Sequence, residues 1–234
     1  MALPKLDTPK YQLTLPSTGE KIDYRPFLVK EQKILMMAQE SEDENMIMRG
    51  MSDLVSSCTF DKLDASKLPV FDIEYVFLKI RSKSVGESVD LSLICPDDGV
   101  TTVTKKVNIG DIEIQISKDH TNEIVLASDV KMYMNYPMMS DITAFDGDDE
   151  TNKTFKLICR CFKELHYKDE IYHKIDVKDE DIISFMDQLD TEQFMEVTKF
   201  FETMPKLRHI VEVENPKTKV KSEVLLEGLQ SFLG

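Results

Sequence analysis

The 234-residue sequence lacks the features that mark several large classes of protein. No apolar run approaches the roughly 20 residues that span a bilayer, and the N-terminal stretch has no signal-peptide core. Its four cysteines are too few for a disulfide framework, which indicates free thiols in a reducing compartment. With eight glycines and four histidines, it contains no phosphate-binding glycine loop, Gly-x-Ser-x-Gly or His-Glu-x-x-His motif. These absences predict a non-enzymatic protein without a transmembrane segment.

The chain is also short of positive charge. It has 43 acidic and 29 basic residues, for a net charge of −14. A nucleic-acid binder needs concentrated Lys and Arg to neutralise phosphates, so nucleic acid and membrane are excluded as partners. Hydrophobic residues make up 41% of the sequence, which is ordinary for a folded globular protein.

The last forty residues carry the clearest pattern, an amphipathic helix that leads into a β-hairpin. Thr191 is the expected N-cap, and Pro205 ends the helix. Alternation then continues through 210–213 and 220–225, on either side of Asn215-Pro-Lys-Thr218. The apolar side chains at helical spacing are Phe194, Val197, Phe200, Phe201 and Met204.

Period-two and helical patterns alternate along the rest of the chain. Hairpins are expected at 11–25 and 89–109, and Asp72 is the expected cap of a helix over 71–80. The pattern also predicts a helix over 151–165, a short extended segment at 169–173, and a solvated acidic loop at 146–150. No Gly-, Ser- or Pro-rich linker divides the chain. We therefore predict one α+β protein over 1–234 made of short helical blocks and at least two hairpins, with these sub-regions: an N-terminal hairpin (1–27), a helical region (28–85), a β-rich region (86–136), a second helical region (137–207) and a C-terminal hairpin (208–234).

Two of the expected hairpin turns resemble degenerate halves of a zinc ribbon. Cys95-Pro-Asp-Asp98 has Asp98 where a zinc knuckle has its second cysteine, and Glu214-Asn-Pro-Lys217 has no cysteine. Together they offer one thiolate where structural zinc needs four N or S ligands. Cys159 and Cys161 would point away from each other on a helix. We predict no bound metal and no cofactor.

Two groups of side chains are candidates for interaction with other proteins. Methionine is unusually frequent, with 13 residues, and its flexible side chain suits adaptable binding surfaces. Core filling is the competing interpretation, and it is favoured for the aromatic stripe of the last helix, Phe194, Phe200, Phe201 and Met204. A groove would be formed by Met36, Met37, Met46, Met48 and Met51.

Several stretches resemble one known family as a set: 24–31 (YRPFLVKE), 57–60 (SCTF), 71–75 (FDIEY), 81–87 (RSKSVGE), 200–207 (FFETMPKL) and 226–232 (LEGLQSF). They are similar to the T4-type bacteriophage baseplate hub family of contractile-tailed phages. The resemblance implies a hub subunit or hub assembly factor whose partners are other hub proteins, the tape-measure protein or the tail tube. It also implies cysteine pairs at both hairpin turns in some members, from which this chain departs.

Three roles remain open at this stage. A stable subunit would bury obligate interfaces of about 2,000 Å² or more and reside in the tail baseplate of the virion. A transient chaperone of the tape-measure protein would act in the host cytoplasm during assembly and be absent from the finished tail. A baseplate-associated hydrolase would need a carboxylate pair such as Glu202 and Asp190, although nothing distinguishes that pair from many others.

Overall fold

The computed structural model describes residues 6–40, 44–142 and 150–232, and its chain forms two compact units. Unit 1 comprises 1–115 and 206–234, and unit 2 comprises 116–205. Unit 2 is thus inserted between β5 (Ile114–Gln115) and β10 (Lys206–Glu214), which pair antiparallel with Leu207 opposite Ile114. The chain thus enters unit 2 directly after one strand and leaves it directly before the strand that pairs with it, so no flexible linker separates the units in sequence. The α+β protein that the sequence indicates is therefore built from two units.

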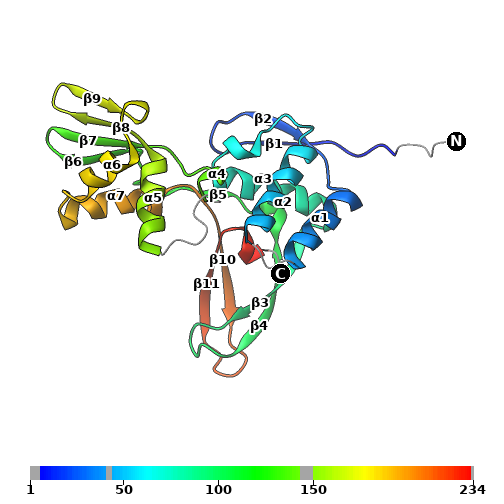
Figure 1. Ribbon diagram of the computed structural model, residues 1–234. Coiled ribbons are helices and arrows are strands. Elements are labelled where there is room, and N and C mark those ends of the chain that lie inside the picture. The colour runs from blue at the N-terminus through cyan, green and yellow to red at the C-terminus, as the bar shows by residue number, and fades with distance from the viewer. Residues whose placement is uncertain (1–5, 41–43, 143–149, 233–234) are drawn as a thin grey trace. The chain divides into compact units, whose positions relative to one another are not determined.

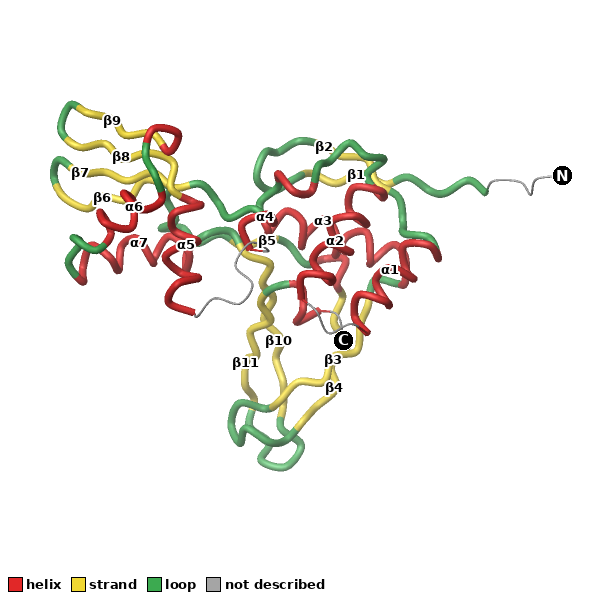
Figure 2. The backbone as a smooth tube through the Cα atoms, in the orientation of Figure 1, coloured by secondary structure: helices red, strands yellow, loops and turns green. Residues whose placement is uncertain are grey.

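Unit 1 combines three hairpin ribbons with a group of helices (Figures 1 and 2). The α+β class is confirmed, and the expected hairpins and helices of this part of the sequence are present. Among the described residues, no helix has the length and hydropathy needed to cross a bilayer. Besides β5 and β10, the elements of unit 1 are β1 (Tyr11–Thr14), β2 (Lys21–Tyr24), α1 (Val29–Glu40), α2 (Glu44–Cys58), η1 (Ala65–Lys67), α3 (Val70–Val85), β3 (Ser88–Ile94), β4 (Thr102–Asn108), η2 (Ile109–Asp111), β11 (Lys221–Glu227) and η4 (Leu229–Phe232).

Helix α3 is the centre of unit 1. Nine of its 16 residues are buried, around the whole circumference of the helix, as expected for a helix enclosed by protein. Pro69, not Asp72, is its N-cap, so the predicted cap was wrong. Asp72 lies within the first turn and is fully buried, where it accepts hydrogen bonds from the backbone N–H (3.1 Å) and hydroxyl of Ser17. Burial raises the pKa of Asp72, and the carboxyl holds the first hairpin against the helix.

A buried ion pair attaches α1 to the rest of unit 1. The Arg25 guanidinium donates to Glu31 Oε1 at 2.9 Å and to Ser57 Oγ at 3.1 Å. Glu31 Oε2 accepts the Leu28 N–H at 2.8 Å, and only 3% of the Glu31 residue is exposed. Burial alone would raise the Glu31 pKa, but these hydrogen bonds and one from Lys30 lower it to about 2. The carboxylate therefore stays ionised inside the protein.

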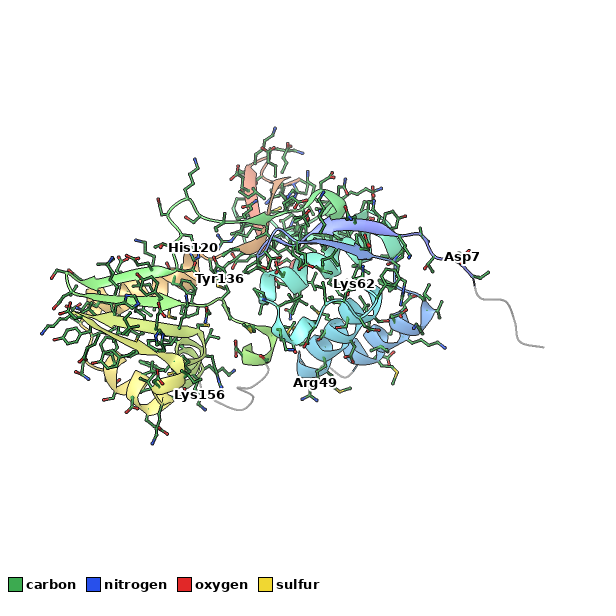
Figure 3. The ribbon with its side chains drawn as sticks, turned by 90° about the horizontal axis from the view of Figure 1, so that it is seen from above. Asp7, Arg49, Lys62, His120, Tyr136 and Lys156 are labelled. Carbon is green, nitrogen blue, oxygen red and sulfur yellow. The ribbon has the colours of Figure 1, made fainter. Side chains whose placement is uncertain are left out.

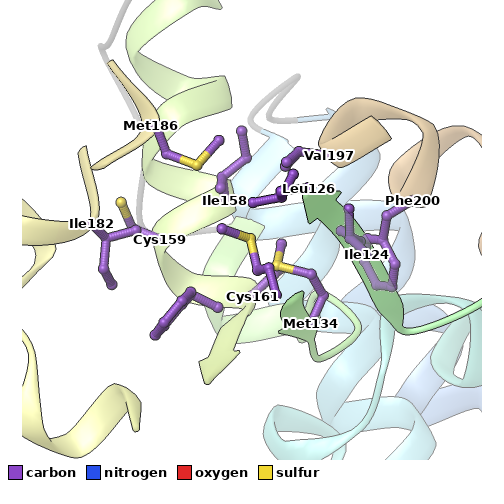
Figure 4. Packing of buried hydrophobic residues seen from close by; sticks show 12 residues of the cluster. Ile124, Leu126, Met134, Ile158, Cys159, Cys161, Ile182, Met186, Val197 and Phe200 are labelled. Atoms are coloured by element: carbon purple, nitrogen blue, oxygen red, sulfur yellow. The ribbon is translucent and has the colours of Figure 1, made fainter. Parts of the chain in front are cut away.

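Unit 2 packs helices against a four-stranded antiparallel sheet in the order β6-β7-β8-β9. Its core is formed by one face of the sheet together with α5, α6 and α7, including Ile158, Met186 and Val197 (Figure 4). The elements of unit 2 are β6 (Glu123–Ala127), β7 (Val130–Met134), α4 (Met139–Ile142), α5 (Glu150–Cys161), β8 (Phe162–Tyr167), β9 (Glu170–His173), η3 (Lys174–Asp176), α6 (Asp179–Met186) and α7 (Thr191–Thr203).

Two sequence predictions in unit 2 need correction. The helix expected over 151–165 ends at Cys161, and β8 follows it directly, so the region 137–207 is not purely helical. Pairing with β7 on one side and β9 on the other supplies the backbone hydrogen bonds that draw 162–167 into a strand. The N-cap of α7 is Asp190 rather than Thr191, in a capping box with Gln193. The acidic loop predicted at 146–150 lies outside the described residues, except for Glu150, which begins α5.

Candidate functional site: the paired hairpins

Three hairpin turns of unit 1 have the same backbone geometry. Each starts at a buried residue that precedes a proline: Leu15, Cys95 or Asn215. The carbonyl of this residue accepts the N–H of the residue four positions later, at 2.8 Å, 3.0 Å and 2.9 Å respectively. That later residue has positive φ in every case, and it is glycine in two turns and Lys219 (φ 63°) in the third. The turn predicted at 214–217 as the counterpart of 95–98 thus lies one residue later, at 215–218, and the same geometry extends to 15–18.

The second and third turns are bound to each other. Asn215 Nδ2 donates to Asp97 Oδ1 at 3.0 Å and to Asp98 Oδ2 at 2.9 Å. The Thr218 hydroxyl donates to Asp97 Oδ2 at 2.5 Å. We call these four residues, Asp97, Asp98, Asn215 and Thr218, the tip lock. It joins the β3–β4 hairpin to the β10–β11 hairpin, and both extend from the helical part of unit 1 (Figure 1).

Hydrogen bonds set the charge state of the tip lock. Bonds from the Thr101 hydroxyl and N–H, from Asn215 and from the Val100 N–H hold the pKa of Asp98 far below its ordinary value. Thr218 and Asn215 likewise lower the pKa of Asp97. Burial raises the pKa of the Cys95 thiol, and the two neighbouring aspartates raise it further. Cys95 is therefore a neutral, enclosed thiol beside two anionic carboxylates.

The positions that would bind zinc in a paired knuckle are thus occupied by a thiol, a carboxylate, an amide and a hydroxyl. Asn215 and Thr218, which correspond to Cys95 and Asp98, use their donors to bind the opposite turn. Within the described part of the chain, no three His, Cys, Asp or Glu side chains are placed to hold a metal ion. Hydrogen bonds across the tip lock connect the hairpins where a metal would connect cysteine knuckles.

Chelation should consequently leave the protein folded. We expect well under one zinc per purified chain, and no change in circular dichroism or thermal midpoint after incubation with EDTA, because hydrogen bonds join the hairpins. Elemental analysis and a melting curve with and without chelator measure both quantities. Stoichiometric zinc together with unfolding by EDTA would contradict the prediction.

The paired hairpins expose large apolar side chains. Ile210 and Leu225 lie directly opposite each other on β10 and β11 and are 51% and 54% exposed. The next outward-facing pair is Glu212 opposite Glu223, and two like charges at this position are unfavourable for the isolated hairpin. On the other hairpin Ile94 and Val100, on either side of the turn, are also exposed. A partner with apolar and basic side chains would cover these apolar residues and neutralise the neighbouring carboxylates.

The five methionines of the predicted groove differ in how far they are buried. Met36 and Met37 on α1 are exposed, at 52% and 67%, and so is Met46. Met48 is half-buried, whereas Met51 is buried in the core and unavailable to a partner. The exposed part of the predicted groove is therefore carried by α1 and the start of α2.

The aromatic stripe of α7 faces the core of unit 2. Phe200 is buried and contacts Phe201 edge-on, with 5.1 Å between ring centroids. Phe194, Phe201 and Met204 are half-buried, and Phe194 stacks on Phe155 at 5.7 Å. Core packing, the favoured interpretation of this stripe, accounts for Phe200.

The cysteines and histidines of unit 2 form no common cluster. Cys159 and Cys161 are buried, and burial raises the pKa of Cys161 to about 12. His166 Nε2 and His173 Nδ1 instead bind the two oxygens of Glu164, at 3.1 Å and 3.0 Å.

One polar group of unit 2 was not foreseen from sequence. His120 Nδ1 lies 3.0 Å from Thr203 Oγ1 and its Nε2 lies 3.1 Å from Tyr136 Oη, and the His120 and Tyr136 rings stack (Figure 3). Burial lowers the pKa of His120, which favours the neutral ring. Because 16 and 83 residues separate the partners, no local pattern could reveal them.

Comparison with known proteins is consistent with these observations. No curated protein and no solved structure gives a significant match. The family model described as T4 bacteriophage base plate protein matches residues 8–234, which covers both units. The chain belongs to the T4 bacteriophage base plate protein family.

Proposed function

We propose that this protein is a non-enzymatic component or assembly factor of the baseplate hub, acting through contacts with other phage proteins. The candidate partners are other hub proteins, the tape-measure protein and the tail tube. The supporting observation is the paired hairpins, which present the exposed Ile210 and Leu225 pair beside Glu212 and Glu223. An isolated two-stranded hairpin is only marginally stable, so joining two of them at the tip lock gives a rigid surface for docking.

A charge placed in this surface should block assembly without unfolding the chain. Both side chains are about half exposed, so Ile210→Glu with Leu225→Glu should lower the melting temperature by only a few degrees. Phage carrying the double variant should yield at least about a hundredfold fewer infectious particles, because two carboxylates would have to be desolvated at the interface. The measurement is plating of a complemented deletion phage.

Ile175 provides a matched control for that experiment. Among the residues of unit 2 that the structure describes, it is the most exposed large apolar one, at 92%, and it lies outside the paired hairpins. Ile175→Glu should plate like wild type. Normal plating by the double hairpin variant would refute a docking role for this surface.

Stable subunit and transient chaperone differ in what remains in the particle. The exposed Met36 and Met37 on α1 favour the chaperone alternative, because adaptable thioether side chains can cover different apolar segments of a client. Quantitative mass spectrometry of purified tails separates the two roles. A fixed number of copies per tail supports the subunit, and absence from tails supports the chaperone.

The hydrolase alternative receives no support from its suggested residues. Asp190 caps α7 by accepting the Gln193 N–H at its Oδ1, while Glu202 is exposed near the other end of the helix. Twelve residues at 1.5 Å per residue separate them by about 18 Å. A glycosidase pair needs roughly 5 to 9.5 Å, so these two carboxylates cannot share one substrate bond.

A further inference from the structure

Unit 2 contains a groove that the proposed role of the hairpins does not use. It encloses about 510 Å³ between the sheet and the segment around α6. Leu165 and Tyr172 form the wall on the sheet side, and Val177 and Phe185 form part of the opposite wall. This volume lies in the range of ligand-binding pockets, and the lining is mostly apolar. The groove can therefore take up one or two large apolar side chains.

An open sheet edge borders the groove. Strand β9 is the last strand in the order β6-β7-β8-β9, and all four of its residues are exposed. Within the described chain no strand pairs with its outer side, so alternate N–H and C=O groups of β9 point away from β8. Tyr172 on β9 lies opposite Leu165 on β8, and both line the groove. An extended segment added to β9 would consequently project alternate side chains toward the groove.

Besides the tyrosine hydroxyls, the groove has two side chains with acceptor oxygens, Asp181 and Gln188. Asp181 is the one charged residue among the described residues of its lining, and it follows two further acidic residues at the start of α6. It accepts the Lys178 N–H at 3.2 Å through Oδ2, which leaves Oδ1 as a second acceptor. Gln188 also lines the groove; its Nε2 donates to Ser184 O at 2.8 Å, which leaves its amide oxygen as an acceptor. Such a lining complements a cationic group next to apolar ones.

We propose that β9 and the adjoining groove bind an extended segment of another protein by strand addition. The segment pairs with β9, inserts apolar side chains between Leu165 and Phe185, and places a Lys or Arg near Asp181. Backbone pairing supplies affinity and the groove selects the side chains, as in other edge-strand complexes. The adjacent strand edge favours a polypeptide over a small molecule. The site lies wholly in unit 2, so a test of this proposal is independent of any test of the hub role of the paired hairpins.

The test uses the full-length protein, labelled with ¹⁵N, and the peptide acetyl-Thr-Val-Thr-Phe-Thr-Lys-Thr-amide. Val, Phe and Lys share one face of this peptide when it is extended, and its single charge limits non-specific attraction. The reversed sequence is tested as well, because the strand direction is free. We expect saturable shifts of β9 and α6 amides, slower amide exchange in β9, and loss of binding when the peptide Phe is replaced by Thr.

Protein variants locate the site. Asp181→Asn keeps the acceptor for the Lys178 N–H but removes the charge, and should weaken peptide binding about fivefold, or about 1 kcal/mol. Asp187→Asn, a change to an exposed carboxylate outside the lining, should leave binding unchanged. Val177→Phe should fill the groove and abolish binding, with a melting curve to verify that the variant is folded.

Three results would overturn the proposal. The first is the absence of saturable shifts up to about 2 mM of either peptide. The second is binding that Val177→Phe does not affect. The third is binding without slower exchange in β9, or with shifts confined to β6 at the opposite edge of the sheet. None of these results bears on plating of the hairpin variants.

Discussion

Replacing Arg25 with methionine should destabilise unit 1 by about 3 to 5 kcal/mol. The substitution removes the guanidinium from the buried Glu31 carboxylate and leaves it the exposed Lys30 ammonium at 3.2 Å, and a buried charge that loses its main partner is strongly destabilising. Urea denaturation of the full chain measures the loss. Hydrogen exchange followed by mass spectrometry should show it as faster exchange in α1 and α2, whose contacts pass through Arg25, Glu31 and Ser57.

The same pair predicts how stability depends on pH. Glu31 has its pKa lowered from 4.5 to about 2 in the folded protein, so folding favours the ionised form. Its contribution to stability is therefore complete above about pH 4.5 and is lost as the pH falls toward 2. Arg25→Met should flatten this part of the stability curve, because the folded-state pKa then rises.

Two variants control for general effects of the substitution. Lys62→Met removes an exposed ion pair with Asp23 at 3.5 Å and should cost less than about 0.5 kcal/mol. Arg25→Met combined with Glu31→Leu should regain much of the lost stability, since no unpaired charge remains. If Arg25→Met were no more harmful than Lys62→Met, the buried pair would not be what holds α1.

Breaking the tip lock should have the second largest effect. Asn215→Ala removes the donor that Asp97 and Asp98 share and the acceptor for the Lys217 N–H, at 2.9 Å. We expect a loss of about 2 kcal/mol and faster amide exchange in β3, β4, β10 and β11, with α3 unaffected. Infectivity should fall together with the rigidity of the paired hairpins.

The first hairpin provides a matched control for the lock. Thr18 and Thr218 occupy equivalent turn positions, and each hydroxyl accepts the N–H two residues later, at 3.2 Å and 3.3 Å. Only Thr218 also donates across to Asp97. The difference between the stability losses of Thr218→Ala and Thr18→Ala thus measures the hydrogen bond between Thr218 and Asp97. Equal losses would show that this bond contributes nothing to stability.

The local sequence pattern predicts most helices and hairpins of the fold, but it does not predict the tertiary contacts between them. Alternation around a proline-containing turn predicts each hairpin of unit 1, because strand and turn chemistry are both local. The helix-to-strand junction at Cys161–Phe162 contains no Gly or Pro, so it was missed. The tip lock links residues 117 to 121 positions apart, and neither turn alone shows that it has a partner. The groove of unit 2 likewise depends on tertiary packing.

The insertion of unit 2 has a consequence for the order of events on the ribosome. Unit 2 is continuous in sequence and can fold once Pro205 has been released from the exit tunnel. Unit 1 has to wait for its last 29 residues, since β10 must return to pair with β5 and Asn215 must reach Asp97 across 118 positions. Until then α3 lacks the backbone N–H of Leu229 that Glu74 accepts, and the part of its surface that β10 and η4 contact stays uncovered. Closure of unit 1 therefore follows the folding of unit 2.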